Sequence, residues 1–214
     1  LSWLVSIGWE TFLAILAVLA TSTIFEELGW SGGTTTKVVA AVAVAALIVM
    51  HAFLAMRKFP ASWRQYSVFT EHRRTLDHGD TTLWWVQVVT GFALFFLAAP
   101  HLFQMLMHPA DIGPYGSGDR VWSERWWPLY LLLLFAVELH AGIGLYRLAV
   151  KWGWGQGDDP HAGRATPKRL KWVLTVVLLV LGLATLAAYM KIGREHADRV
   201  GEVYTPAWVK GDAR

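Results

Sequence analysis

Two histidines of this chain, His51 and His140, lie at matching distances from a basic residue that follows an apolar stretch. His51 is six residues before Arg57, and His140 is seven residues before Arg147. At about 1.5 Å of rise per helical residue, each imidazole lies roughly 10 Å inside its helix end, so antiparallel neighbours could present both to one iron ion. Two neutral imidazoles on the axial positions of a haem favour electron transfer over oxygen chemistry. The spacing therefore predicts a bis-histidine haem.

Small residues neighbour both histidines and leave room beside a flat cofactor: Ala45, Ala46, Ala52, Ala55, Ala141, Gly142 and Gly144. Small residues also mediate ordinary contacts between membrane helices. A histidine that only forms a hydrogen bond within a packed bundle is therefore the alternative to a ligand.

Two further polar residues belong to apolar stretches. His101 lies twenty residues after Thr81, about 30 Å along an ideal helix, and is either a ligand of a second haem or an interfacial histidine. Glu138 is a candidate for proton transfer, because an intramembrane carboxyl is costly; the alternative is a protonated carboxyl bonded to a neighbouring helix. Glu26 by itself indicates a solvated loop. We expect no ligands among the remaining histidines, which fall in loops or at helix ends: His72, His78, His108, His161 and His196.

The elements that carry these residues are expected to be transmembrane helices. Of 214 residues, 55% are hydrophobic, which is too apolar for a soluble domain. Four runs can cross a hydrocarbon core of about 30 Å, and these are residues 38–56, 83–107, 126–150 and 172–190. A fifth run, 3–24, is interrupted by Glu10. The runs lack the alternation of barrel strands, so the predicted fold is an all-α integral membrane protein, one helical bundle over 1–214.

Charge is unevenly distributed among the predicted loops. The 57–82 and 151–171 loops are rich in Arg and Lys. The 25–36 and 108–125 loops contain more acidic than basic residues. This positive-inside pattern places the first two loops in the cytoplasm and the others, with the tail after Lys191, outside. It also accounts for the formal charge of +3 without a nucleic-acid partner.

Residue types at the run ends suggest where the helices begin and end. Asp80 can cap the third run, and the Gly- and Pro-rich stretch 153–167 indicates an exposed loop. The chain has no cysteine, which excludes a c-type haem, a thiolate-held iron–sulfur cluster and a disulfide within it. Leu1 is not an initiator methionine, so we expect the gene product to start upstream.

Several long motifs resemble the dihaem cytochrome b subunit of menaquinol:fumarate reductase, within the succinate:quinone oxidoreductase family. The similarity extends from about Phe25 to Met190. The motifs are HAFLAMRKFP at 51–60, HGDTTLWW at 78–85, WPLY at 127–130, VELH at 137–140 and GLYRLAVKWGW at 144–154.

The resemblance implies a multi-pass subunit of a bacterial inner (cytoplasmic) membrane that carries two haems b. It would anchor a flavoprotein and an iron–sulfur subunit on the cytoplasmic side and pass them electrons from menaquinol in anaerobic respiration, with a dimer of the complex as a further assembly. His51 and His140 match ligands of the proximal haem, and His101 matches a ligand of the distal haem. Other positions match residues near haem propionates (Trp84 and Lys151), residues linked to proton movement (Arg120 and Glu138) and an acidic residue that accepts protons from menaquinol (Glu26).

One departure concerns the fourth haem ligand. In the family it lies in the first helix, and counting back from His51 puts it at about Leu1 or just before it. No histidine precedes His51, so either the ligand lies upstream or the distal site differs. In the same alignment, residues 3–24 correspond to the end of that helix and an outer connection.

Three other functions could account for some of these features. A succinate:quinone reductase running in the opposite direction would have the same helices and ligands. A cytochrome b anchor of a hydrogenase or formate dehydrogenase explains buried histidines but not the long motifs. A transporter with His and Glu as proton-coupling residues would bind no haem.

Overall fold

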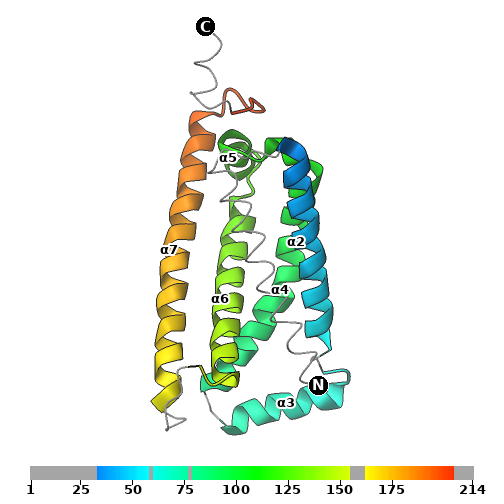
Figure 1. Ribbon diagram of the computed structural model, residues 1–214, viewed down its shortest axis with the longest axis vertical. Coiled ribbons are helices and arrows are strands. Elements are labelled where there is room, and N and C mark those ends of the chain that lie inside the picture. Colours follow the sequence, from blue (N-terminus) through cyan, green and yellow to red (C-terminus); the bar gives the residue numbers. More distant parts are fainter. Residues whose placement is uncertain (1–32, 58–59, 77–78, 155–161, 205–214) are drawn as a thin grey trace. The chain divides into compact units, whose positions relative to one another are not determined.

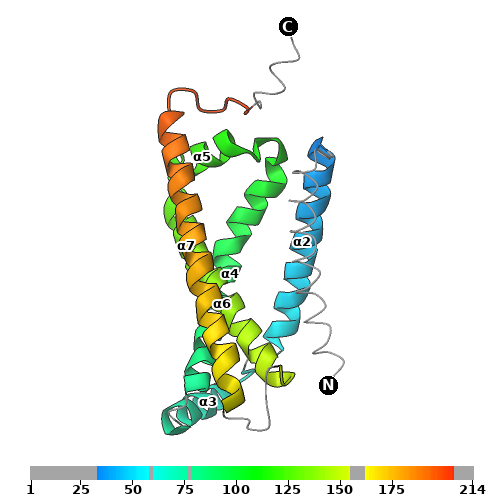
Figure 2. The same cartoon turned by 60° about the vertical axis from the view of Figure 1, so that its left-hand side comes forward.

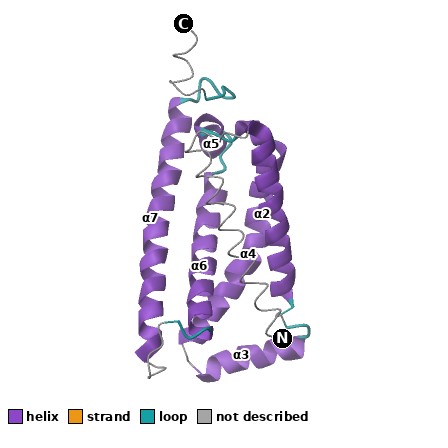
Figure 3. Cartoon of the chain, viewed as in Figure 1, coloured by secondary structure: helices purple, strands orange, loops and turns teal. Residues whose placement is uncertain are grey.

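The computed structural model describes residues 33–57, 60–76, 79–154 and 162–204, most of which are helical (Figures 1 and 3). In chain order the elements are α2 (Gly33–Met56), α3 (Trp63–Leu76), α4 (Gly79–Met107), the 3-10 turn η1 (Pro109–Asp111), α5 (Pro114–Trp122), α6 (Trp127–Lys151), the 3-10 turn η2 (Ala162–Arg164) and α7 (Ala165–Glu195). No strand occurs within these described ranges, and the predicted all-α class is confirmed.

The chain divides into two compact units. The first contains residues 1–75 and 101–110, and the second contains residues 76–100 and 111–214. Helix α4 belongs to both, and the division follows Pro100, whose missing N–H removes one hydrogen bond from the helix.

Three described helices are long and apolar enough to cross a membrane, namely α4, α6 and α7. They contain the predicted runs 83–107 and 172–190 and, apart from its first residue, the run 126–150, since Trp126 is the N-cap of α6. In α2, counting only described residues, the apolar part is the shorter stretch Val42–Met56, and the run 3–24 lies outside the described residues. Large apolar side chains are exposed along α4 and α7, including Val89, Phe92, Phe96, Val180 and Leu181, as expected for surfaces that contact hydrocarbon.

Helices α6 and α7 pack against each other; they lie next to each other in Figure 1 and cross in the turned view of Figure 2. Small residues bring them together: a Cβ on Gly142 of α6 would lie 2.6 Å from the Thr175 hydroxyl oxygen of α7. A Cβ on Gly182 of α7 would meet the Leu134 side chain of α6. This small-residue packing is typical of helices in membranes, where close van der Waals contact drives association.

Helix α5 packs on the end of α7 through two glycines. A Cβ on Gly118 would lie 2.9 Å from the Gly193 nitrogen, and a Cβ on Gly193 would meet the Gly118 carbonyl oxygen. Only residues without a Cβ allow backbones to approach this closely. The prediction of a plain loop over 108–125 was wrong here, because α5 is a short helix that buries Asp119 and Arg120.

Two other predicted boundaries were also wrong. Helix α3 lies inside the predicted 57–82 loop, and α7 begins at Ala165, inside the predicted 153–167 loop. Pro167 does not prevent this, since the N–H groups of a first helical turn have no partner in the helix. Asp80 is the second residue of α4 rather than its cap, and its carboxylate bonds to other elements instead.

Candidate functional site

His140 lies half-buried in α6 and contacts the backbone of α4. Its Nδ1 is 2.9 Å from the carbonyl oxygen of Gln87. A carbonyl only accepts hydrogen bonds, so Nδ1 carries the proton and donates it. In the neutral ring Nε2 then holds the lone pair, which is the form of histidine that binds a metal. The donor set therefore fits an axial haem ligand.

The other two predicted ligands belong to the first unit. His51 lies in α2 and His101 follows Pro100 in α4, and both side chains are half-buried. Because His140 belongs to the second unit, a shared iron between His51 and His140 stays a prediction. Among the described residues no group of three or more His, Asp and Glu side chains could hold a metal ion; a haem needs only two axial imidazoles.

Gln87 is tied to α6 by its side chain as well. Its Oε1 accepts a hydrogen bond of 2.7 Å from Nη1 of Arg147. Arg147 lies about two turns after His140 on α6, so Gln87 connects α4 to α6 at two levels. Its bond to Arg147 is charge-assisted and therefore stronger than a hydrogen bond between neutral groups. Sequence reasoning used Arg147 only as an end marker and did not identify Gln87, although a Gln within an apolar run is a visible signal.

Another polar group lies at the start of α4. The Tyr146 hydroxyl donates to Asp80 Oδ1 at 2.9 Å, and Arg164 Nη1 lies 3.4 Å from Asp80 Oδ2. Tyr146 is buried, while the ion pair is partly exposed and contributes little by itself. Asp80 therefore connects the starts of α4 and α7 with the end of α6.

The residues predicted near haem propionates lie in α4 and α6. Trp84 packs edge-on against Trp85, with ring centroids 5.4 Å apart. Lys151 is exposed at the end of α6, and its Nζ lies 5.6 Å from the Trp152 ring centroid. An ammonium and an indole N–H are suitable donors to a propionate, and the assignment stays a prediction.

Two of the predicted proton-transfer residues are described, in different helices. Glu138 is half-buried in α6, and at two residues from His140 it leaves the helix about 200° away around the axis. Arg120 of α5 is only 3% exposed and lies within hydrogen-bonding reach of the Tyr130 hydroxyl. Glu26 lies outside the described residues.

A buried histidine–carboxylate pair next to Arg120 was missed by the sequence analysis. Asp119 of α5 and His196, which follows α7, are 4% and 1% exposed. His196 Nδ1 lies 3.0 Å from Asp119 Oδ1, and the Gly201 N–H donates to Asp119 Oδ2 at 3.0 Å. Tyr115 stacks on the His196 ring with centroids 4.2 Å apart. The pair joins α5 to the segment after α7 and so holds Arg120 in place.

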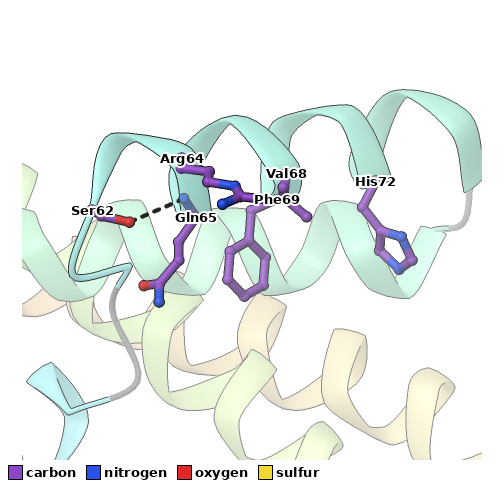
Figure 4. A pocket seen from close by; sticks show the side chains of 6 residues that line it. All are labelled: Ser62, Arg64, Gln65, Val68, Phe69 and His72. Atoms are coloured by element: carbon purple, nitrogen blue, oxygen red, sulfur yellow. Dashed lines mark hydrogen bonds between the residues drawn. The ribbon is translucent and has the colours of Figure 1, made fainter.

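A pocket on α3 contains none of the predicted site residues. It is lined by Ser62, Arg64, Gln65, Val68, Phe69 and His72 (Figure 4). The Gln65 N–H donates to the Ser62 hydroxyl at 3.3 Å, and His72 supplies the pocket's one imidazole. These residues do not assemble a reaction centre.

Comparison with known proteins places these features in a family context. Residues 64–188 match the family described as "Succinate dehydrogenase/Fumarate reductase transmembrane subunit". The chain is 56% identical over 155 residues to the fumarate reductase cytochrome b subunit of Wolinella succinogenes, which covers 72% of this chain and 60% of the relative. It is 52% identical over 160 residues to the subunit of the same name from Helicobacter pylori strain J99, which covers 75% of this chain and 61% of the relative. The matched part is thus less than two thirds of either relative.

Proposed function

The chain belongs to the succinate dehydrogenase/fumarate reductase transmembrane subunit family, and from this premise we propose that it is the dihaem cytochrome b anchor of a fumarate reductase. It oxidises menaquinol and passes the electrons to partner subunits. Menaquinol gives two electrons and two protons and becomes menaquinone. The electrons reduce fumarate to succinate in the flavoprotein subunit, with two protons taken up there.

One observation carries the proposal, namely the hydrogen bond from His140 Nδ1 to the Gln87 carbonyl oxygen at 2.9 Å. It fixes the imidazole in the form that binds iron, in a helix that is long and apolar enough to cross a membrane. A haem ligand gains orientation and basicity from the same bond. The match to a transmembrane subunit of succinate dehydrogenase and fumarate reductase weighs against a proton-coupled transporter.

The described histidines then have distinct roles. His51 and His140 hold the iron of the proximal haem, and His101 is one ligand of the distal haem. Haem, when bound, carries single electrons between menaquinol and an iron–sulfur centre of a partner. Trp84 and Lys151 bind haem propionates at the end of the bundle that faces the iron–sulfur subunit.

Proton movement is assigned to three residues. Glu26 accepts protons when menaquinol is oxidised near the outer side. Glu138 and Arg120 take part in returning protons through the protein, which offsets the charge moved by the electrons. Arg120 suits this part because it is buried beside the Tyr130 hydroxyl, where a cation changes the protonation of nearby groups strongly.

The sidedness follows from the charges. The 57–82 and 151–171 loops face the cytoplasm of a bacterium, where the flavoprotein and iron–sulfur subunits bind. Residues 1–214 serve as one membrane-anchor domain, which includes both compact units. The opposite direction, succinate oxidation with quinone reduction, uses the same helices. Quinone potential and the partner subunits decide between the two directions.

The purified complex containing the full-length chain tests this function. We expect a haem b spectrum, reduction of the haem by a menaquinol analogue, and reoxidation by fumarate. A complex that reduces fumarate with an artificial donor but whose haem is not reduced by quinol would contradict the quinol-oxidising role. A preparation without haem would contradict the cytochrome assignment altogether.

A further inference from the structure

Helices α4 and α6 contact each other through two reciprocal pairs, each of one glycine and one large polar residue. A Cβ on Gly91 of α4 would lie 2.7 Å from Cε1 of His140, and a Cβ on Gly144 of α6 would lie 2.9 Å from Nε2 of Gln87. Four residues separate Gly91 from Gln87 on α4 and His140 from Gly144 on α6, which is about one turn. Each helix therefore offers a glycine where the other presents a side chain, at neighbouring levels of an antiparallel pair.

The glycine at 91 determines whether the His140 ring can reach the Gln87 carbonyl. In a helix, a side chain leans towards the N-terminus and covers the turn that precedes it. A side chain at 91 would thus cover the carbonyl four residues earlier, which is that of Gln87. A Cβ there would also lie 3.1 Å from His140 Nδ1. The hydrogen bond of 2.9 Å between Nδ1 and this carbonyl needs the space that Gly91 leaves.

The second pair holds the acceptor in position. The Gln87 side chain lies over Gly144 and is anchored by the Arg147 guanidinium, with 2.7 Å between Oε1 and Nη1. Gln87 is therefore fixed to α6 by its side chain while its backbone carbonyl receives the imidazole. A backbone acceptor cannot be exchanged by mutation, so the glycines and the Gln87 side chain are the adjustable parts.

We propose that Gly91, Gly144 and Gln87 are positioning residues for the haem ligand His140. They hold the imidazole with Nδ1 protonated and Nε2 ready for iron, and they fix the plane of the ring. The hydrogen bond to the carbonyl also makes the imidazole a stronger donor to the metal, which stabilises the ferric state. This inference rests on the proposed haem function and adds to it the residues that adjust the ligand.

The test compares Gly91→Ala with Gly182→Ala in the purified complex. Both new methyl groups meet a side chain of α6 in the second unit, His140 in the first case and Leu134 in the second. For Gly91→Ala we expect haem affinity to fall tenfold or more, about the loss seen when a hydrogen-bond partner of a metal ligand is removed. We also expect an altered low-spin ferric resonance and a higher midpoint potential for one haem. Gly182→Ala should keep the parent resonance and potential.

The outcomes separate this inference from the proposed function. A parent complex with haem b and a Gly91→Ala complex with unchanged affinity, resonance and potential would overturn the inference and leave the function intact. A parent complex without haem would overturn both. If Gly91→Ala does not assemble, Gly144→Ala decides, because its methyl meets the flexible end of Gln87: a shift in the same direction supports the inference, and an unshifted resonance overturns it.

Discussion

The buried pair of Asp119 and His196 allows a quantitative prediction for the end of the bundle that holds Arg120. Their side chains are 6% and 2% exposed, and the Nδ1–Oδ1 distance is 3.0 Å. Replacing His196 by Ala removes a hydrogen bond to a buried carboxylate, worth about 1.5–3 kcal/mol. It also removes the stacking on Tyr115, worth about 0.5–1.5 kcal/mol. The expected loss in free energy of unfolding is therefore about 2–4.5 kcal/mol.

A double-mutant cycle in detergent isolates the pair. Asp119→Ala, His196→Ala and the double variant are unfolded with denaturant, and the coupling energy is taken from the four free energies of unfolding. We expect a coupling of about 1.5–3 kcal/mol. The stacking on Tyr115 is lost in both variants that lack His196, so it cancels in the cycle.

The matched control is Arg199→Ala in the same segment. Arg199 is half-exposed, and its ion pairs with Asp198 and Glu202 are longer, at 3.7 and 3.6 Å. Exposed pairs of this kind contribute about 0–1 kcal/mol. A coupling energy for Asp119 and His196 no larger than the effect of Arg199→Ala would refute the view that the pair fastens α5 to the segment after α7.

Two further predictions concern other polar residues of the second unit. Glu138→Gln should slow menaquinol-driven fumarate reduction at least tenfold while leaving reduction by an artificial donor at the parent rate, and equal rates in both assays would remove Glu138 from proton transfer. Tyr146→Phe should cost about 1.5–3 kcal/mol, because the buried hydroxyl donates to the Asp80 carboxylate at 2.9 Å. An unchanged denaturation midpoint would mean that the hydroxyl does not hold α6 to α4.

The transmembrane helices could be predicted from the sequence, and His140 could be named as a candidate haem ligand, because both leave a local signal. A hydrocarbon core demands about twenty apolar residues in succession, and this requirement is visible in α4, α6 and α7. His140 stands out as an imidazole within such a run. Its distance from Arg147 gave its depth without any knowledge of its neighbours.

Helix α5 and the residues around it could not be predicted in the same way. The helix is short, and its burial depends on Gly118 meeting Gly193, which are far apart in the sequence. The partner of Asp119 is His196, beyond α7, so neither residue alone indicated a buried pair. Side chains that find partners only through tertiary packing are invisible to periodicity.

The acceptor for His140 is hidden for a different reason. It is the backbone carbonyl of Gln87. Because every residue has a backbone carbonyl, the type of residue at this position does not identify it as the acceptor. Gly91 is an indirect sign of this contact, since a glycine inside a helix costs about 1 kcal/mol of helix stability relative to alanine. A packing or functional reason for a glycine there could be suspected, but its partner could not be named.

Haem content per chain, measured in the purified complex for the parent and for His140→Ala, shows whether His140 holds a haem. We expect a Soret band in the parent and the loss of one haem in the variant, because His140 is the imidazole that contacts the Gln87 carbonyl in the described part of the chain. The same haem content in both proteins, or a colourless parent complex with the full-length chain present, would contradict it.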